Sequence, residues 1–458
     1  MVLIKNAVVL TMNDKREVYR NGAVAVDGTE IREVGKTEDL LNKYAYDEIV
    51  DAKDRIVMPG FVAAHVHLFQ TLYRGMGDDL PLADWLLKCV YALSYGLDED
   101  ASRTAAELST LEMMRSGITT YVDSHYITRD KHCYDGIAEG TLNTGMRGVI
   151  VRSTVNSETT PEAFREPIDV AQRECARVIE AYHGYQDGML SVRVEPLNES
   201  SATTDMIRAM HEISKQYHVG MSMHLAETII RYQDTLRNYG VTPVEYLNRL
   251  GVLDSNILLA HCIWLNKRDM AILGATGANV VYNAVSNQYL ADGICDVPGL
   301  HRAGVRVAIG PDGAASNNSL NMFNVLKFAV LLQRAYTLDI FALTAEKILE
   351  MATIEGARAI GMGDRIGSLE PGKKADILML DLRDVTMTPN MSCISNIVYA
   401  ADTSAVDAVM VNGKFTLRDK NFVRVDEHRV YEKANQTLRR LVDQSGFELR
   451  LCSWPVVG

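Results

Sequence analysis

The sequence predicts an α/β protein built around a closed (β/α)8 TIM barrel, with a smaller β domain assembled from both chain ends. Three observations support this fold. Short apolar segments alternate with longer segments of helical periodicity, polar residues follow most of the apolar segments, and both flanks contain short alternating strands. Eight strands that alternate with helices fit a closed parallel barrel better than an open doubly wound sheet.

Eight apolar segments, each four to nine residues long, predict the barrel strands. They are Ile56–Ala64, Ile118–Val122, Arg147–Arg152, Ser191–Val194, Gly220–Met223, Ile257–Ala260, Asn279–Tyr282 and Val305–Ile309. Helical spacing of apolar residues predicts helices between them, notably over Ala101–Arg115, Ala163–Tyr182, Thr204–Tyr217 and Val241–Arg249.

The two flanks predict the β domain. Residues 1 to 54 alternate in the manner of short strands around an Asp27-Gly28 turn, and Ala408–Leu417 surrounds Asn412-Gly413, a strong hairpin signal. We therefore expect β domain parts at 1–57 and 364–430, the barrel at 58–363, and a C-terminal helix and tail at 431–458.

Composition excludes several classes of function. The net charge of -12 argues against nucleic acid or an anionic membrane as a partner, because binding either requires a basic surface. No apolar run reaches the ~18 to 20 residues that a membrane span needs. The seven cysteines include no Cys-x-x-Cys pair, which argues against a disulfide framework and a cysteine zinc site. The N-terminus lacks the order of a secretory signal, so we expect a cytoplasmic protein.

The ends of the predicted strands carry the residues of a candidate site. In a parallel barrel these ends open on one face, where active sites lie. Following the segments in order, the polar residues are His65 and His67, Asp123 and His125, Glu195, His224, His261, Asn283 and Asp312. Core strands alone would not require such residues at so many ends.

His65 and His67 are two residues apart, so on a strand both imidazoles face the same side. Such a pair by itself is more often structural or solvated. Together with His224 and Asp312 it offers three imidazoles and a carboxylate, which suit a divalent first-row metal, with zinc the default and iron or manganese possible. The metal would lower the pKa of a bound water from about 15.7 to roughly 7.

Two further residues are candidates for catalysis beside Asp312, which can accept a proton from the water. Glu227, three residues after His224, would carry protons from the water to the leaving group, and His261 would steady developing charge. The alternative for Glu227 is an exposed carboxylate at a helix start. Its position beside His224 favours the catalytic interpretation.

The motifs resemble the amidohydrolase superfamily, in particular its mononuclear deaminase and chlorohydrolase branch. They are His65-Val66-His67, Met223-His224-Leu225-Ala226-Glu227, Ala260-His261-Cys262 and Ile309-Gly310-Pro311-Asp312-Gly313, and the similarity extends to Gly367–Asp376 near the return into the β domain. The resemblance implies a distorted barrel, a composite β-sandwich, a homo-oligomer, and hydrolytic attack on an aminated or halogenated ring carbon.

Within that branch the chain is similar to atrazine chlorohydrolase and melamine deaminase, with one departure. Where those proteins carry asparagine or aspartate after the metal aspartate, this chain has Gly313. The segment Asp312–Asn318 instead resembles methylthioadenosine and S-adenosylhomocysteine deaminases, although their Pro-His pair is missing at Glu195–Asn198.

We therefore expect a metal-dependent hydrolytic deaminase of a small aminated N-heterocycle of purine, pterin, pyrimidine or triazine type. An s-triazine chlorohydrolase is the alternative, and a non-catalytic scaffold is disfavoured because no metal ligand is missing. Candidate substrate contacts are Gln70, Trp85, Tyr91, His125, Asn283 and Ser316. Trp85 could stack on a planar ring, though an aromatic residue there is more often part of a helix core.

Overall fold

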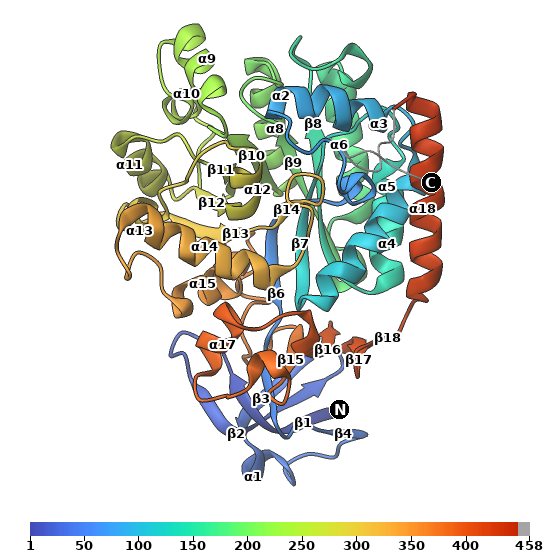
Figure 1. Cartoon of the computed structure of the whole chain (residues 1–458), viewed down its shortest axis with the longest axis vertical. Helices are drawn as coiled ribbons and strands as arrows, with labels where there is room; N and C mark the ends of the chain where they lie inside the picture. The colour runs from blue at the N-terminus through green and yellow to red at the C-terminus, as the bar shows by residue number, and fades with distance from the viewer. Residues whose placement is uncertain (448–458) are drawn as a thin grey trace, which may run out of the picture.

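The structure is a computed structural model that describes residues 1–447 of the 458-residue chain. It contains two sheets, a barrel and a smaller mixed sheet beneath it (Figure 1). The last part of the predicted C-terminal tail, residues 448–458, lies outside the described residues. Within residues 1–447, no helix has both the length and the apolar character needed to cross a membrane.

The predicted (β/α)8 barrel is confirmed. Its strands are β6 (Phe61–His67), β7 (Ile118–His125), β8 (Arg147–Thr154), β9 (Leu190–Pro196), β10 (Gly220–Leu225), β11 (Ile257–His261), β12 (Asn279–Tyr282), β13 (Arg306–Ile309) and β14 (Asp312–Gly313). All neighbouring strands are parallel. The ring closes through a broken eighth strand, because β13 pairs with β12 whereas β14 pairs with β6.

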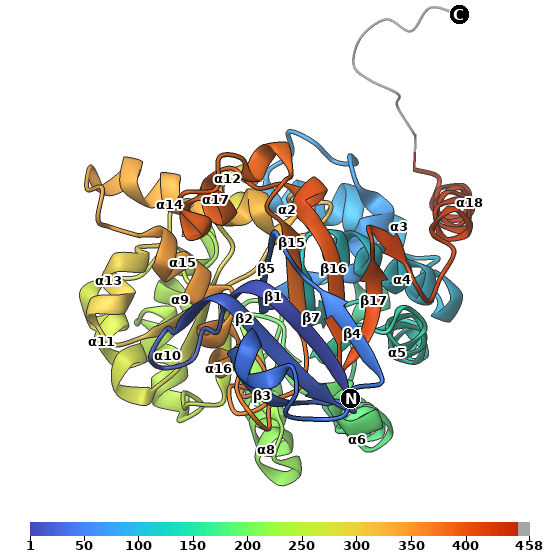
Figure 2. The ribbon, with the colours of Figure 1, turned by 90° about the horizontal axis from the view of Figure 1, so that it is seen from below.

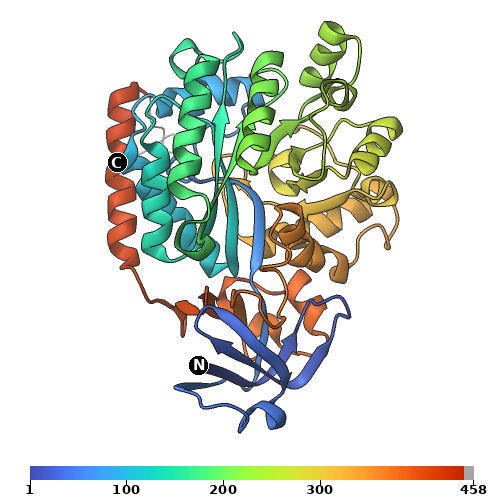
Figure 3. The same ribbon diagram turned by 180° about the vertical axis from the view of Figure 1, so that it is seen from behind.

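Helices surround the barrel, as the view from behind shows (Figure 3). The longer ones are α4 (Glu99–Arg115), α5 (Cys133–Thr144), α6 (Ile168–Tyr182), α8 (Thr204–Tyr217), α9 (Ile229–Tyr239), α10 (Pro243–Leu250), α11 (Lys267–Thr276) and α14 (Met322–Thr337). The shorter ones are α2 (Leu82–Trp85), the π-helical η2 (Leu86–Tyr91), α3 (Ala92–Ser94), α7 (Tyr185–Gly188), α12 (Ala284–Tyr289), α13 (Val297–Arg302), α15 (Ala345–Met351) and α16 (Ile354–Ala359). Short 3-10 helices form at η1 (Leu68–Tyr73) and η3 (Glu162–Phe164).

Two predicted helices begin later than expected, each because of a proline. The helix predicted from Ala163 begins at Ile168, since Pro167 lies just before it in an extended conformation. The helix predicted from Val241 begins at Pro243, and the Thr242 side chain caps it by accepting from the Glu245 backbone N–H.

The first predicted barrel strand, Ile56–Ala64, is corrected by the structure into two strands in different sheets. β5 (Arg55–Pro59) belongs to the small sheet, and β6 continues from it into the barrel. Gly60 makes the join, because a Cβ at this position would collide with the side chain of Thr119. The strand that carries His65 and His67 is therefore anchored directly in the small sheet.

Both chain ends build the small sheet, as predicted (Figure 2). Its strand order is β18-β17-β16-β15-β5-β1-β2-β3, with β4 also paired to β1. The bounds not yet given are β1 (Val2–Leu10), β2 (Val18–Asp27), β3 (Glu30–Lys36), β4 (Glu48–Asp51), β15 (Ile377–Asp381), β16 (Val406–Val411), β17 (Lys414–Arg418) and β18 (Asn421–Phe422). The predicted hairpin joins β16 to β17, with positive φ at both Asn412 and Gly413.

The remaining helices lie near the small sheet or along the barrel. They are α1 (Thr37–Leu40), η4 (Val385–Met387), α17 (Cys393–Tyr399), η5 (Thr403–Ala405) and α18 (Glu427–Ser445). α18 packs along α4 and α3 on one side of the barrel (Figure 1). The predicted domain limits at residues 57, 363 and 430 stay a prediction.

A buried ion pair joins the barrel to the small sheet. Arg147, the first residue of β8, donates from Nε to Asp376 Oδ2 at 2.7 Å and from Nη2 to Asp376 Oδ1 at 3.0 Å. The Arg147 side chain is 0% exposed and that of Asp376 2%. The Asn412 backbone N–H also donates to Asp376, so the pair fixes the hairpin as well.

We expect Arg147→Met to lower the free energy of unfolding by about 3–5 kcal/mol, because it leaves a buried carboxylate unpaired. Thermal and urea unfolding of the metal-loaded protein would measure the loss. The double variant Arg147→Met/Asp376→Leu should recover much of it, since no uncompensated charge remains. Arg173→Met is the control, because the Arg173–Asp169 pair is about two-thirds exposed and contributes little. Equal effects of the two single variants would contradict this account.

Candidate metal centre

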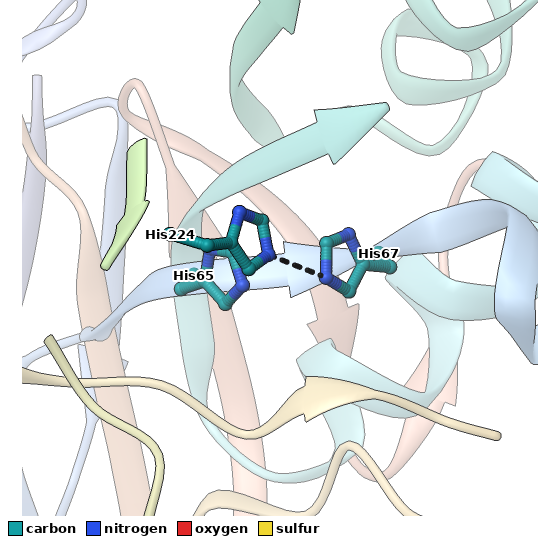
Figure 4. A group of neighbouring side chains, drawn as sticks. All are labelled: His65, His67 and His224. Atoms are coloured by element: carbon teal, nitrogen blue, oxygen red, sulfur yellow. Dashed lines mark hydrogen bonds between the residues drawn. The ribbon is translucent and has the colours of Figure 1, made fainter. Parts of the chain in front are cut away.

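Three imidazoles converge where β6 and β10 end (Figure 4). His65 and His67 both lie on β6, and His224 lies across the ring from them, on β10. The His65 ring centroid is 4.7 Å from both others. The Nε2 atoms of His67 and His224 are 3.3 Å apart. All three side chains are buried.

Asp312 completes this group from the broken eighth strand. Its Oδ1 is 3.3 Å from His67 Nε2 and 3.7 Å from His65 Nε2. Donor atoms of His65, His67 and His224 lie within 4.8 Å of one another, as do those of His65, His261 and Asp312. The structure thus brings the four predicted ligands together.

Hydrogen bonds orient two of the imidazoles toward the centre. His67 Nδ1 lies 2.5 Å from the Ser124 carbonyl oxygen, to which it donates. His224 Nδ1 lies 3.2 Å from the Leu197 carbonyl oxygen and 3.3 Å from Glu195 Oε1. A neutral imidazole that donates from Nδ1 keeps the Nε2 lone pair for a ligand.

The electrostatics of the centre suit a cation. Burial, followed by the neighbouring imidazoles, lowers the pKa of His65 well below its usual value, and burial also lowers the pKa of His67. Both rings are therefore neutral and able to ligate. The Nε2 atoms of His65 and His261 are buried without a hydrogen-bond partner among the described residues. Three nitrogens and a carboxylate oxygen match the donors that zinc and similar divalent metals take.

Strained backbone places the carboxylate. Asp312 adopts a φ of +66°, which non-glycine residues rarely take, at the break between β13 and β14. Its Oδ2 accepts from Ser286 Oγ at 2.5 Å and its Oδ1 from the Gly313 N–H at 2.8 Å. Positive φ values also occur at Ala226 (+49°), just after β10, and at His261 (+71°), the last residue of β11.

Glu227 lies just after β10 and is 5% exposed. Its Oε1 is 3.5 Å from His261 Nε2, and its Oε2 forms an ion pair with Arg231 in the first turn of α9. Burial raises the pKa of Glu227, but the charges of His261 and Arg231 outweigh burial and hold it at about 2. Glu227 is therefore a carboxylate in the resting site.

His261 is held by Asn287, whose Oδ1 accepts from His261 Nδ1 at 2.8 Å. This leaves His261 Nε2 directed toward the carboxylates, 3.5 Å from Glu227 Oε1 and 3.9 Å from Asp312 Oδ2. The imidazole can accept a hydrogen bond from a molecule bound between them, or donate one when protonated.

A pocket opens over the centre, and its polar wall includes His67, His224, Glu227, His261 and Asp312. Four of the six predicted substrate contacts line it, namely Gln70, Trp85, Tyr91 and Ser316. The other lining residues are Leu82, Leu86, Tyr126, Leu197, Asn198, Ser201, Arg231 and Leu290. The wall thus combines aliphatic and aromatic surface with a few polar groups, as small-molecule sites usually do.

The other two predicted contacts, His125 and Asn283, lie behind the pocket wall. His125 is fully buried between the rings of Phe69 and Tyr134, and burial lowers its pKa to about 3. Asn283 is also fully buried, with Nδ2 at 3.4 Å from His261 Nδ1. Residues at strand ends can point to either side of the barrel wall, so position alone did not place them.

Gln70 is fixed beside the candidate ligand Asp312. Its Nε2 donates to Tyr126 Oη at 3.0 Å, and its Oε1 has no hydrogen-bond partner among residues 1–447. Gly313 makes room for this amide, because a Cβ at residue 313 would collide with Gln70 Oε1. Trp85 lines the same pocket, and its Nε1 has no hydrogen-bond partner in the described part of the chain. Both residues can therefore exchange hydrogen bonds with a bound heterocycle.

Sequence reasoning missed several residues that support the site. Arg231, Asn287 and Ser286 contact Glu227, His261 and Asp312, respectively. Glu195 was noted at a strand end but had no assigned role. Only Arg231 carried a local signal, because a basic residue four positions after Glu227 on a helix lies on the same side.

The amidohydrolase family model matches residues 56–416. A 5-methylthioadenosine/S-adenosylhomocysteine deaminase from Syntrophomonas wolfei subsp. wolfei is 33% identical over 442 residues, which cover 96% of this chain and 99% of that protein. An adenosine deaminase from Xanthomonas campestris, crystallised with zinc, is 29% identical with a TM-score of 0.91 over 96% of this chain and 98% of that one. An atrazine chlorohydrolase from Arthrobacter aurescens TC1 has a TM-score of 0.90 at 24% identity, over 96% and 100%, a likeness of fold alone.

We expect Glu195→Gln to weaken metal binding by ten- to a hundredfold, because partners of ligand imidazoles tune metal affinity to that extent. Competition of the purified protein with a chromogenic chelator would measure the affinity. Glu199→Gln is a matched control, since Glu199 is also buried and its Oε1 accepts from the Ala226 N–H rather than from an imidazole. Unchanged affinity in Glu195→Gln would remove Glu195 from the support of the metal.

Proposed function

The chain belongs to the amidohydrolase family, and we propose how its residues carry out the hydrolytic deamination of a small aminated N-heterocycle. The observation that carries the proposal is the placement of five polar residues over one pocket. His67, His224 and Asp312 present metal donors there, while Glu227 and His261 face the same space from neighbouring strand ends.

We assign His65, His67, His224 and Asp312 as the ligands of one divalent metal, with Zn²⁺ as the ion that the donor set favours. When bound, such a metal acts as a Lewis acid that lowers the pKa of water toward neutrality. The zinc in the related adenosine deaminase supports this choice.

Glu227 is the proton carrier of the proposed mechanism. Its ion pair with Arg231 and the nearby His261 keep the carboxylate ionised, so it can take a proton from the attacking water. The carboxyl group that forms can then give this proton up to the substrate. Its acceptors are the ring nitrogen and the departing amine, which leaves poorly unless protonated.

Asp312 and His261 assist Glu227 from neighbouring positions in the same site. Asp312 Oδ2 accepts from Ser286 and lies 3.9 Å from His261 Nε2, where it can take the second proton of the water, which then passes to the departing amine as ammonia leaves and the ring carbon becomes a carbonyl. His261, held by Asn287, stabilises negative charge as the tetrahedral adduct forms. Gln70, Trp85, Tyr91 and Ser316 would position the ring.

We propose adenosine-type compounds as the first substrates to consider. The deaminases named above are at least 29% identical to this chain. The atrazine chlorohydrolase is only 24% identical to this chain, so the alternative of triazine dechlorination has less support. A non-catalytic scaffold has less support, because donor atoms of His65, His67, His224 and Asp312 lie close together.

Incubating the zinc-loaded protein with aminated heterocycles and with a chlorotriazine would test the reaction. The aminated set would include adenosine, 5-methylthioadenosine and S-adenosylhomocysteine, after the relatives named above, together with a pterin and melamine. We expect ammonia release from one or more purine nucleosides and no chloride release. Chloride release without ammonia would reverse the assignment of the leaving group.

We expect Glu227→Gln to retain the metal while turnover falls at least a hundredfold, because the amide cannot carry the proton. Steady-state ammonia release and metal analysis would be measured on the same samples. Glu245→Gln serves as control, since Glu245 lies in the first turn of α10 away from the pocket. Wild-type turnover in Glu227→Gln would exclude it from the mechanism.

A further inference from the structure

The pocket over the metal centre has a polar end and an apolar wall. The polar end consists of three candidate metal ligands together with Glu227 and His261. The residues here called the apolar wall are Leu82, Trp85, Leu86, Tyr91, Leu197 and Leu290. Four of these six come from α2 and η2, and Figure 1 shows α2 over the open end of the barrel. A substrate whose reacting carbon lies at the polar end therefore extends along apolar side chains.

The pocket also contains polar groups that carry no charge. Asn198 Oδ1 accepts from the Ser200 N–H at 2.9 Å and from the Ser201 N–H at 2.7 Å. Ser316 Oγ donates to the Gly313 carbonyl oxygen at 3.1 Å. Such amide and hydroxyl groups can exchange hydrogen bonds with a neutral ligand, but they cannot neutralise a charged one.

Within residues 1–447, Arg231 is the only cationic side chain other than the imidazoles that lines the pocket, and its charge is already balanced. It forms an ion pair with Glu227. Burial lowers the pKa of Arg231, but the charges of Glu227, Glu199 and Asp292 outweigh burial and raise it above the usual value. Arg231 is thus surrounded by carboxylates of the protein itself, which leaves no free positive charge for an anionic substrate group.

A second arginine near the open end of the barrel is also occupied. Arg152, on β8, is 1% exposed and does not line the pocket. Its Nη1 donates to Glu166 Oε2 at 2.9 Å and its Nη2 to Glu166 Oε1 at 2.6 Å. This two-pronged pairing is the geometry in which arginine binds a carboxylate most strongly, so a substrate carboxylate would have to displace Glu166 to use it.

We propose that the pocket selects heterocycles whose substituent, away from the reacting ring carbon, is uncharged and apolar, such as an alkyl or alkylthio group; this inference rests on the proposed deamination. An anionic or zwitterionic substituent would lose its hydration along the apolar wall without gaining a partner, which is unfavourable. An alkylthio group gains from the same burial. Among the proposed substrates, 5-methylthioadenosine meets this requirement and the zwitterionic S-adenosylhomocysteine does not.

Two nucleosides of nearly the same shape would test the effect of charge alone, namely neutral adenosine-5′-carboxamide and anionic adenosine-5′-carboxylate. With the zinc-loaded protein we expect kcat/KM for ammonia release to be at least a hundredfold higher for the carboxamide, and highest for 5-methylthioadenosine. Calorimetric titration of zinc-loaded Glu227→Gln should show the same preference in Kd, because binding does not require the proton transfer.

Leu86→Arg would place a cation in the apolar wall at a half-buried position. We expect it to narrow the ratio between carboxamide and carboxylate at least tenfold, by raising kcat/KM for the carboxylate. Leu87→Arg is the matched control, because it adds the same charge to η2 at a side chain that is 53% exposed and does not line the pocket. It should leave the ratio unchanged, and the Tm of both variants would verify folding.

The possible outcomes separate this inference from the proposed function. A carboxamide-to-carboxylate ratio near one, in turnover and in Kd, would overturn the inference and leave the deamination intact. The expected ratio in Kd without ammonia from any nucleoside would support the inference and overturn the proposed function, and binding of neither nucleoside would overturn both. Equal narrowing by Leu86→Arg and Leu87→Arg would show that long-range charge, not the apolar wall, sets the preference.

Discussion

Donor atoms from separate strands must reach a space less than 5 Å across, and the parallel barrel meets that constraint. All strand ends open on one face, but ideal strands alone do not aim every side chain inward. The backbone is therefore strained at Ala226, His261 and Asp312, each at a cost of about 1–3 kcal/mol. The surrounding core must hold these residues in place, so the packing of the barrel and the chemistry of its mouth are coupled.

The small sheet is part of the same arrangement. β6 carries two of the proposed ligands and emerges from β5 through Gly60 without an intervening loop. On β15, Leu378 and Leu380 pack into the core shared with the barrel, whereas Ile377 and Met379 pack within the small sheet. The sheet from both chain ends thus sets the position and direction of the strand on which the centre is built.

The sequence predicted the features that repeat along the chain. Apolar segments and the polar residues after them indicated the barrel and the ligands, because strand period and strand direction are local properties. The break in the eighth strand and the change of sheet at Gly60 left no such pattern, since both arise from contacts with distant strands. Asn287, the hydrogen-bond partner of His261, lies too far along the chain for residue spacing to predict the contact. His125 and Asn283 lie at the ends of barrel strands, as expected, but both are buried and neither lines the pocket.

The Gln70 side chain occupies the space beside Asp312 that a side chain at residue 313 would need. A larger side chain at 313 could enter only if the amide of Gln70 withdrew, and with it the acceptor offered to a bound ring. Because that amide is the end of a flexible side chain, a residue larger than glycine at 313 would be admitted by moving Gln70, so the two positions jointly set the shape of the pocket beside Asp312.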